Sequence, residues 1–337
     1  MDSRERLVDR VEPGPLSLPR VRAAGVLGRS AEAAAGDRRR VIQTIHTPGC
    51  AADESPFLAT PDRNRRVSRQ LFRYVRCARC GLVRLADPPA DLAPYYQAEY
   101  YELPSLQRLA RIADADPFKI DLVCRFATRG RLLEIGPAHG VFAYQAKRAG
   151  FDVDVIEMDA RACEHLRETV GVHAWCTAAP HEVLATATPY DVIALWHVIE
   201  HVPDPWMLLQ HIATALAPGG IVVIAAPNPD AWQLTIMGSH WPHLDAPRHL
   251  YLLPPSVVTA FLSRFGVDLV HVATTDADAR RWDRFSWQRL LMNEVPGRWP
   301  GRAAYVAGTA LSVVIAPFEA RHPQGSAYTM VMRKQAA

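Results

Sequence analysis

The sequence has no strong excess of charge, no long hydrophobic run and few cysteines, and each of these absences excludes a class of protein. Lysine and arginine total 38 against 35 acidic residues, so the formal net charge is only +3, too little to indicate extended binding to nucleic-acid phosphates. The uncharged apolar stretch at residues 303–318 is shorter than the roughly 20 residues of a membrane span. The first residues interleave charge with proline and have no apolar signal-peptide core. We therefore expect a cytoplasmic protein without a transmembrane span or a nucleic-acid partner.

The cysteines are the first candidates for chemistry. Six in a chain of this length, without export, do not indicate a disulfide framework, so a close pair is first considered as metal ligands. Cys77 and Cys80 form a C-x-x-C-G knuckle, in which the glycine frees the backbone to turn around an ion. A tetrahedral zinc needs two further ligands, for which His46 and Cys50 are the candidates. The sequence predicts one structural zinc, with simple buried thiols as the alternative.

The rest of the composition, 49% hydrophobic and 22% charged, is that of a globular protein. Changes in composition along the chain suggest boundaries between its parts. The predicted order is a mobile leader (1–40), a zinc-ribbon-like module (41–102), a linker helix (103–127), a core (128–275), a helical insertion that serves as a lid or an oligomer contact (276–326), and a final strand and tail (327–337). The apolar run at 303–318 is the candidate contact of a homodimer.

Within the core, short apolar runs alternate with helical segments, which is typical of a parallel sheet covered on both faces. We therefore predict an α/β, doubly wound sheet. The expected strands are RLLEIG, DVDVIEMD, VHAWC, YDVIALW, GIVVIAAPN, VDLVHVAT and AYTMVMRK. The expected helices cover residues 106–127, 141–149, 161–170, 206–216 and 256–265, and the fourth is expected to stop at a turn over 217–220.

A glycine turn follows the first of these strands and precedes a helix. Gly136 and Gly140 allow the backbone to approach a ligand, although a tight turn also needs glycine for structural reasons. Glu157 ends the next strand, twenty-one positions after Gly136, the spacing at which an acidic side chain reaches a ribose diol. Glu134, beside the turn, would repel a pyrophosphate but suits a ligand with ammonium and sulfonium groups. These residues favour S-adenosylmethionine over NAD.

At these motifs the chain resembles the class I S-adenosylmethionine-dependent methyltransferases, over about residues 132–272. The resemblance rests on LLEIGPAHG, VIEMD, YDVIALWHVIEHVPDP and LAPGG, and WHVIEHVPDP is most similar to the ubiquinone-biosynthesis O-methyltransferase branch. It implies a Rossmann-like, mostly parallel sheet with one antiparallel strand near the C-terminus. The chain departs from the family at Ala138, where glycine is common, and at Thr177, where an acidic adenine contact is often found.

The resemblance also implies which residues contact the donor. Glu134 and the glycines would line its methionine end, Glu157 its ribose, and Met158 its adenine, with Trp196 and His197 as the far wall. Core packing is the alternative for Met158 and Trp196. The implied cofactor residues are Glu134, Gly136, Pro137, Ala138, Gly140, Glu157, Met158, Thr177, Trp196 and His197. Similar methyltransferases carry a small zinc ribbon and a tyrosine-rich stretch before the core, although their first ligand pair is normally C-x-x-C.

Methyl transfer from a sulfonium is an in-line displacement, so alignment and exclusion of water supply most of the acceleration. A base is needed only where the acceptor must lose a proton. His197, Glu200 and His201 follow the strand YDVIALW, at the edge where parallel sheets bind ligands. His201 is the candidate general base, with a histidine hydrogen-bonded within the loop as the alternative. The same residues spell the zinc-peptidase pattern H-x-x-E-H, which requires a long helix that the prolines directly after it disfavour.

Aromatic and basic side chains crowd the segment after GIVVIAAPN. Its place above the cofactor edge predicts contact with the acceptor, and the alternative is that Arg248 and Asp245 only fix the loop. The candidate substrate residues are Tyr100, Trp241, His243, Arg248, His249 and Tyr251. The predicted function is methyl transfer to a small molecule, such as a hydroxyl of a specialised metabolite, sugar or aromatic precursor. The alternatives are an RNA methyltransferase, against which the missing N-P-P-aromatic motif counts, and a non-catalytic cofactor-binding scaffold.

Overall fold

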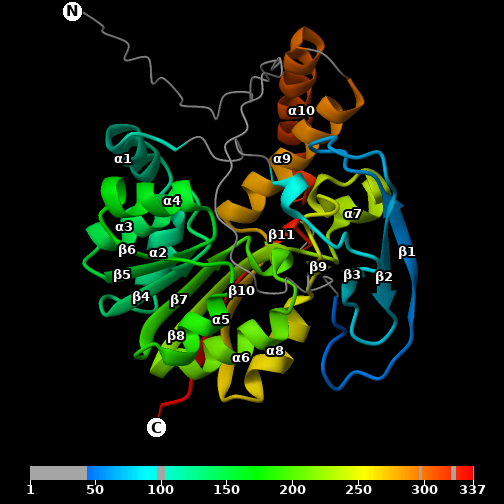
Figure 1. Ribbon diagram of the computed structural model, residues 1–337. Helices are drawn as coiled ribbons and strands as arrows, with labels where there is room; N and C mark the ends of the chain where they lie inside the picture. The colour runs from blue at the N-terminus through cyan, green and yellow to red at the C-terminus, as the bar shows by residue number, and fades with distance from the viewer. Residues whose placement is uncertain (1–43, 97–102, 296–297, 320–323, 337) are drawn as a thin grey trace, which may run out of the picture. The chain divides into compact units, whose positions relative to one another are not determined.

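The computed structural model describes residues 44–96, 103–295, 298–319 and 324–336 (Figure 1). The predicted leader and Tyr100 lie outside the described residues. The strands are β1 (Glu54–Thr60), β2 (Phe72–Cys77), β3 (Val83–Leu85), β4 (Arg131–Ile135), β5 (Asp152–Glu157), β6 (His173–Cys176), β7 (Tyr190–Trp196), β8 (Leu216–Pro227), β9 (Tyr251–Leu252), β10 (Val267–Ala273) and β11 (Ala327–Lys334). The α-helices are α1 (Leu106–Ala115), α2 (Phe118–Cys124), α3 (Val141–Arg148), α4 (Ala160–His165), α5 (Pro180–Thr186), α6 (Pro205–Ala215), α7 (Trp232–Met237), α8 (Pro255–Ser263), α9 (Ala277–Glu294) and α10 (Arg298–Glu319). The short 3₁₀ helices are η1 (Ala93–Tyr95), η3 (Ile199–His201), η4 (Gly238–His240) and η5 (Pro242–Leu244), and η2 (Leu166–Val170) is a short π-helix that continues α4.

Seven strands form the main sheet, in the order β10-β11-β8-β7-β4-β5-β6. Neighbouring strands run parallel from β8 to β6, whereas β11 is antiparallel to both β8 and β10. The predicted fold class, a mostly parallel doubly wound sheet with one antiparallel strand near the C-terminus, is confirmed. Because β4, β5 and β7 are adjacent and parallel, their carboxyl ends meet at one edge, where such sheets bind ligands.

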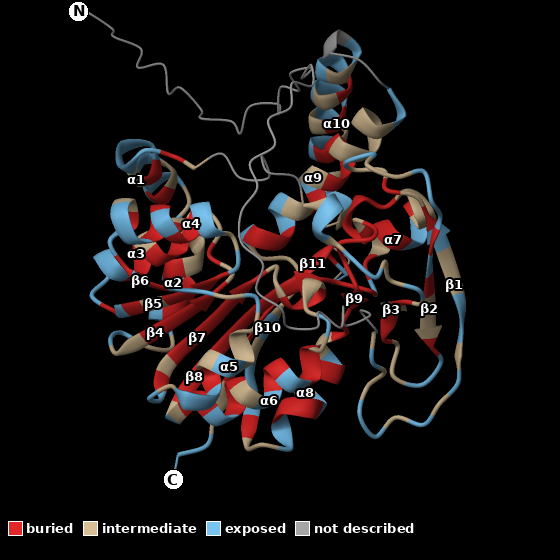
Figure 2. Cartoon of the chain, viewed as in Figure 1, coloured by how far each residue is buried: buried red, intermediate tan, exposed pale blue. Residues whose placement is uncertain are grey.

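Helices cover both faces of this sheet (Figures 1 and 2). One face packs its apolar side chains against α1, α2 and α3, and the other packs against α5, α6 and α8. Strand β7 lies between the two apolar layers and is buried along almost its whole length, as expected for a central parallel strand. The uniformly apolar strand patterns in the sequence are the signature of this burial.

A second, antiparallel sheet has the order β1-β2-β3-β9. Its first three strands belong to the predicted zinc-ribbon-like module, but β9 comes from the segment predicted as core. Phe72, Tyr74 and Leu85 of the module share one hydrophobic cluster with Trp206 and Val258 of the helices below the main sheet. The module and the core are therefore joined by a common sheet and a common hydrophobic cluster.

Two predicted element boundaries are wrong. The single helix expected over 106–127 is two helices, α1 and α2, because Pro117 has no N–H to continue the first one. The turn expected over 217–220 is part of β8, which already pairs with β7 at Leu216 and passes through an irregularity before the regular register begins. The register passes directly from Leu216 to Ile221, and Gly219 has φ +77°, so residues 217–220 form a bulge within the strand.

The insertion between β10 and β11 consists of α9 and α10. These helices pack closely at Gly308, where an added Cβ would lie 2.5 Å from the Cα of Gln288. The outer face of α10 is apolar, and Val306, Val313 and Val314 are 65%, 63% and 76% exposed. Over Pro300–Glu319, α10 is long and apolar enough to cross a membrane by length and composition, a test that core helices of soluble proteins also pass. The sequence analysis did not predict a helix of this length here, because only the uncharged residues 303–318 were considered and the structure extends the apolar segment at its start.

Candidate active site

The glycine turn joins β4 to α3 at the carboxyl edge of the sheet. Gly136 has φ +71°, and a Cβ there would lie 2.6 Å from Cγ2 of Val198. Gly140 has φ +76° and is the N-cap of α3. Ala138 between them also has a positive φ, +50°, which is why glycine would be the less strained residue at that position. The turn thus has the compact backbone that was predicted from its sequence.

Glu134 and Glu157 stand at the ends of the adjacent strands β4 and β5. Glu134 is 3% exposed, its Oε2 has no hydrogen-bond partner among the described residues, and burial raises its pKa to about 8. Glu157 accepts hydrogen bonds from the N–H groups of Met158 (2.8 Å), Asp159 (2.9 Å) and Ala138 (3.2 Å). Glu157 therefore ties the glycine turn to β5, whereas Glu134 retains an oxygen able to bind a ligand.

The other predicted cofactor residues differ in their surroundings. Met158 is 63% exposed at the end of β5, so the alternative of core packing is wrong for it. Trp196 is buried and packs edge-on against Phe142, with ring centroids 5.3 Å apart. Thr177 lies directly after β6 and donates its N–H to the carbonyl of Glu157 (2.9 Å). Pro137 accepts from the N–H of Gly140 (2.9 Å) within the turn.

Lys119 of α2 is a charged neighbour that the sequence analysis missed. Its Nζ lies 4.8 Å from the ring centroid of Trp196. Burial lowers its pKa, and the negative charges of Asp278 and Glu134 oppose that shift. The end of the sheet thus combines a cation with two carboxylates.

His197 follows β7 directly and is held by a residue of the insertion. Its φ is +57°, unusual for a residue other than glycine. Its Nε2 lies 2.7 Å from Oδ2 of Asp278, and its Nδ1 lies 3.8 Å from Oε1 of Glu200. Burial alone would raise the pKa of Asp278, but the charge and hydrogen bond of His197 lower it to about 2. Asp278 could not be predicted as a partner of His197, because the two residues are distant in the sequence and share no local motif.

Glu200 and His201 lie on η3, a single turn. The long helix that the zinc-peptidase pattern requires is absent from residues 197–201, so that alternative is wrong. Glu200 is fully buried, and neither of its carboxylate oxygens has a hydrogen-bond partner among the described residues. His201 is half-buried, and its Nδ1 lies 3.0 Å from the carbonyl of Arg248 and 3.2 Å from the hydroxyl of Tyr96. Among the described tyrosines of the module, Tyr96 is the one that reaches the candidate base.

The predicted substrate loop is largely folded into the protein interior. Arg248 is fully buried and pairs with Asp62 (2.7 Å) and Asp245 (2.8 Å). Arg248 therefore fixes the loop, as the alternative interpretation held, and does not offer its guanidinium to an acceptor. Asp62 is a partner of Arg248 that could not be predicted from the sequence. Tyr251 is also fully buried, and its hydroxyl donates to the carbonyl of Pro203 (2.9 Å).

Three further residues of this loop are buried as well. Trp241 is 1% exposed, and its Nε1 has no partner among the described residues. His243 is 4% exposed, and burial lowers its pKa to about 4, so it is neutral at pH 7. His249 is buried beside His201, with ring centroids 4.6 Å apart. Two residues of this loop thus contact the candidate base, Arg248 through its backbone carbonyl and His249 through its ring.

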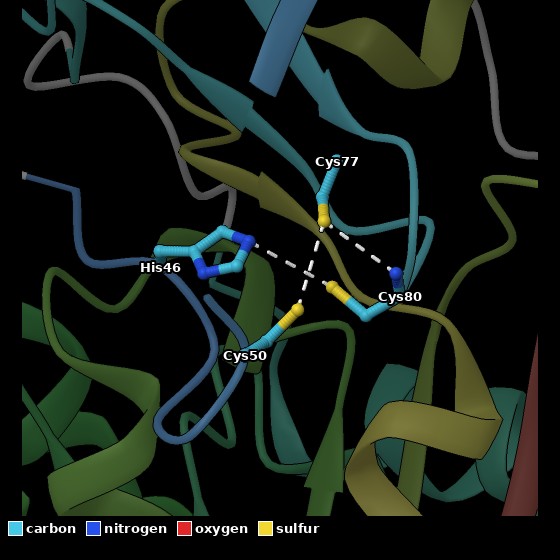
Figure 3. A group of neighbouring side chains, drawn as sticks. All are labelled: His46, Cys50, Cys77 and Cys80. Atoms are coloured by element: carbon cyan, nitrogen blue, oxygen red, sulfur yellow. Dashed lines mark hydrogen bonds between the residues drawn. The ribbon is translucent and has the colours of Figure 1, made fainter. Parts of the chain in front are cut away.

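The predicted metal ligands converge in the module (Figure 3). Potential ligand atoms of His46, Cys50, Cys77 and Cys80 all lie within 4.8 Å of one another. The sulfurs of Cys50 and Cys77 are 3.8 Å apart, as are Sγ of Cys80 and Nε2 of His46. Sulfurs bound to one zinc at about 2.3 Å in a tetrahedron are about 3.8 Å apart.

The electrostatic surroundings of Cys77 suit a thiolate. Burial alone would raise its pKa, but N–H groups of Cys80 and Arg79 point at its sulfur and lower the pKa to about 6. A thiolate is the form of cysteine that binds a metal. The donor set of three sulfurs and one imidazole, with this spacing, fits a structural zinc.

Residues 105–272 match the family model described as a methyltransferase domain. A ubiquinone biosynthesis O-methyltransferase of Aeromonas salmonicida is 33% identical over 144 residues, which cover 40% of this chain and 60% of that protein. One from Bordetella avium is 30% identical over 150 residues, covering 41% and 62%. The chain thus spans less than two thirds of the length of these relatives.

The solved structures that match this chain have low sequence identity to it, and their TM-scores are below 0.5. A SAM-dependent methyltransferase from Archaeoglobus fulgidus has a TM-score of 0.41 at 16% identity, covering 68% of this chain and 93% of that one. The cyclopropane synthase MmaA2 from Mycobacterium tuberculosis has a TM-score of 0.43 at 14% identity, covering 64% and 83%.

Proposed function

Because residues 105–272 belong to the methyltransferase domain family, we propose that this protein transfers the methyl group of S-adenosylmethionine to a hydroxyl of a small molecule. The relatives named as O-methyltransferases favour an oxygen acceptor. The observation that carries the proposal is the pair of buried carboxylates, Glu134 and Glu157, at the ends of adjacent strands beside a tight glycine turn.

The described residues fit such a donor. Glu134 has a buried oxygen without a partner, suited to an ammonium group. Glu157 would accept from the ribose hydroxyls, and exposed Met158 would cover the adenine. Lys119, on the same edge, would bind the donor carboxylate. The donor supplies an activated methyl group on sulfur, so the protein has only to bind, orient and exclude water.

The proton of the acceptor hydroxyl is the other requirement. His201 is the candidate general base, acting through Nε2, because its Nδ1 faces the carbonyl of Arg248. His197 and Glu200 complete the catalytic set that we propose for this edge. An acceptor such as a specialised metabolite, a sugar or an aromatic precursor would enter beside half-buried His201.

Binding of the donor tests the proposal first. Calorimetry with S-adenosylmethionine should show binding to the wild type and a loss of at least about tenfold in affinity in Glu157→Ala, since a lost charged hydrogen bond costs about 1.5–3 kcal/mol. Glu182→Gln, an exposed carboxylate on α5, is the matched control. Labelled methyl groups should then appear in a hydroxylated acceptor from a screened panel. Absence of donor binding would refute the proposal, and binding without turnover on any acceptor would favour the scaffold alternative.

We also infer a structural zinc held by His46, Cys50, Cys77 and Cys80. Elemental analysis should find about one zinc per chain in the wild type and in Cys124→Ser, whose thiol is exposed. The Cys80→Ser variant should have lost that zinc. Equal zinc in both variants would refute the assignment. The cytoplasmic location, and self-association through α10, remain part of the same proposal.

A further inference from the structure

We propose that Cys163 and Cys176 are a redox-sensitive thiol pair, which a hydroperoxide converts to a disulfide beside the residues proposed to bind the donor. Cys163 lies on α4, and Cys176 is the last residue of β6. Both are free thiols in the structure, and neither belongs to the cysteine cluster of the module. Disulfides in cytoplasmic proteins, where they occur, are usually of this redox-sensing kind.

The sheet places the side chain of Cys176 on the face that α4 covers. Strand β6 runs parallel to β5, with Cys176 opposite Glu157 and Ala174 opposite Val155. Ala174 and Val155 belong to the apolar layer that also contains Leu166, at the point where η2 continues α4. Because side chains alternate between the two faces of a strand, Cys176 points to the same face as Ala174, two residues earlier.

Cys163 approaches the same point from the helix. Its S–H donates to the carbonyl of Glu157 at 3.4 Å, and Glu157 is the strand neighbour of Cys176. Arg167, one turn after Cys163, donates to the carbonyl of Ala174 (2.6 Å) and so fixes this helical segment on β6. Burial, followed by the adjacent thiol of Cys176, raises the pKa of Cys163 to about 12. The two thiols are therefore neighbours, although thirteen positions separate them in the sequence.

The thiols differ in exposure, which assigns their roles. Cys176 is exposed, so a hydroperoxide reaches its thiolate, whereas Cys163 is fully buried. The sulfur of Cys176 attacks the peroxide oxygen and the O–O bond breaks, which gives a sulfenic acid and an alcohol, or water where the oxidant is hydrogen peroxide. The sulfur of Cys163 then attacks the sulfenic sulfur, and the hydroxide leaves as water with the thiol proton of Cys163. Two thiols are thus oxidised to one disulfide, while one hydroperoxide is reduced by two electrons.

The effect of the disulfide on donor binding rests on the proposed function. Thr177 directly follows Cys176, and its N–H donates to the same carbonyl of Glu157 (2.9 Å), the residue proposed to bind the ribose. The disulfide removes the S–H group of Cys163 from that carbonyl and draws the two sulfurs to about 2.05 Å. The end of β6 therefore moves toward α4, and the oxidised protein should bind S-adenosylmethionine at least about tenfold more weakly.

Peptide mapping of the zinc-loaded protein tests the thiol pair independently of activity. The reduced protein is treated with hydrogen peroxide, the remaining thiols are alkylated, and the digest is analysed by mass spectrometry. We expect a linked peptide that joins Cys163 to Cys176 and is lost after dithiothreitol. Cys124→Ser, which alters an exposed thiol at the end of α2, should form the same linked peptide. Cys163→Ser should form none, and dimedone should trap a sulfenic acid at Cys176 in this variant.

Calorimetry before and after peroxide treatment measures the consequence for the donor. The oxidised wild type should show the weaker affinity, and dithiothreitol should restore it. Cys176→Ser should have the same affinity before and after peroxide, which separates the thiol pair from any oxidation of the cysteine cluster in the module.

The outcomes separate this inference from the proposed function. Absence of the linked peptide, or a sulfenic acid at Cys176 that persists in the wild type, would overturn the thiol pair. Equal donor affinity of the reduced and the disulfide-linked protein would overturn its effect on binding. The wild-type mapping decides the question where a variant fails to fold, as judged by its melting temperature. A linked peptide without donor binding to the reduced protein would instead refute the methyl-transfer proposal and leave the thiol pair standing.

Discussion

The buried carboxyl of Glu134 makes a quantitative prediction about pH. Burial raises its pKa to about 8, with the charge of Lys119 opposing the shift. About one such group in ten is ionised at pH 7 and about one in a hundred at pH 6. A cationic ligand that needs the carboxylate must first displace its proton. The association constant of S-adenosylmethionine should therefore rise about tenfold from pH 6 to pH 7.

Calorimetry at several pH values between 6 and 7 measures this dependence. The range ends at pH 7 because an α-amino group such as that of the donor titrates near pH 8. Two buffers with different ionisation enthalpies should report the release of about one proton per donor bound. Glu134→Gln keeps the shape of the side chain without its titration, so its affinity should not vary with pH. A wild-type affinity as flat as that of the variant would refute the reasoning.

Three further predictions concern stability and the glycine turn. Asp62→Asn should lower the free energy of unfolding by about 3 kcal/mol, because it removes one charged partner of buried Arg248. The control is Asp87→Asn, which removes an exposed ion pair with Arg73 and should cost about 1 kcal/mol or less. Equal losses of stability in denaturant titrations would contradict this prediction. Gly136→Ala should weaken donor binding in calorimetry at least tenfold, about 1.4 kcal/mol, because its Cβ meets Val198, whereas Gly150→Ala, with φ +93° and open space, should leave donor affinity unchanged. Burial raises the pKa of Asp283 to about 6, so its contribution to stability is present below pH 4 and falls by about 3 kcal/mol as the pH rises from 4 to 6. The melting temperatures of the wild type and Asp283→Asn should therefore converge or cross over that range. A difference in melting temperature that does not change with pH would contradict the assignment.

The sequence predicts the sheet and the cofactor edge because both depend on local patterns. Apolar runs such as YDVIALW indicate buried strands, and adjacent parallel strands bring Glu134 and Glu157 to one edge without further information. The antiparallel strand β11 followed from the family resemblance, because periodicity alone cannot assign strand direction.

What the sequence could not predict lies in contacts between distant segments. Asp278 is 81 residues from His197, and Asp62 is 186 residues from Arg248, so neither pair leaves a local signal. Arg248 was open to two interpretations because a buried ion pair and an acceptor contact use the same guanidinium chemistry. Only the folded chain distinguishes the two.

Strand β9 completes the small antiparallel sheet, and this limits where the chain can be truncated or exchanged with a relative. A truncated protein starting near residue 103 would expose the edge of β9 and the apolar side chains that now meet Phe72 and Tyr74. Chimaeras that exchange the amino-terminal part should therefore carry residues 251–252 with it, since those two residues complete the transplanted sheet.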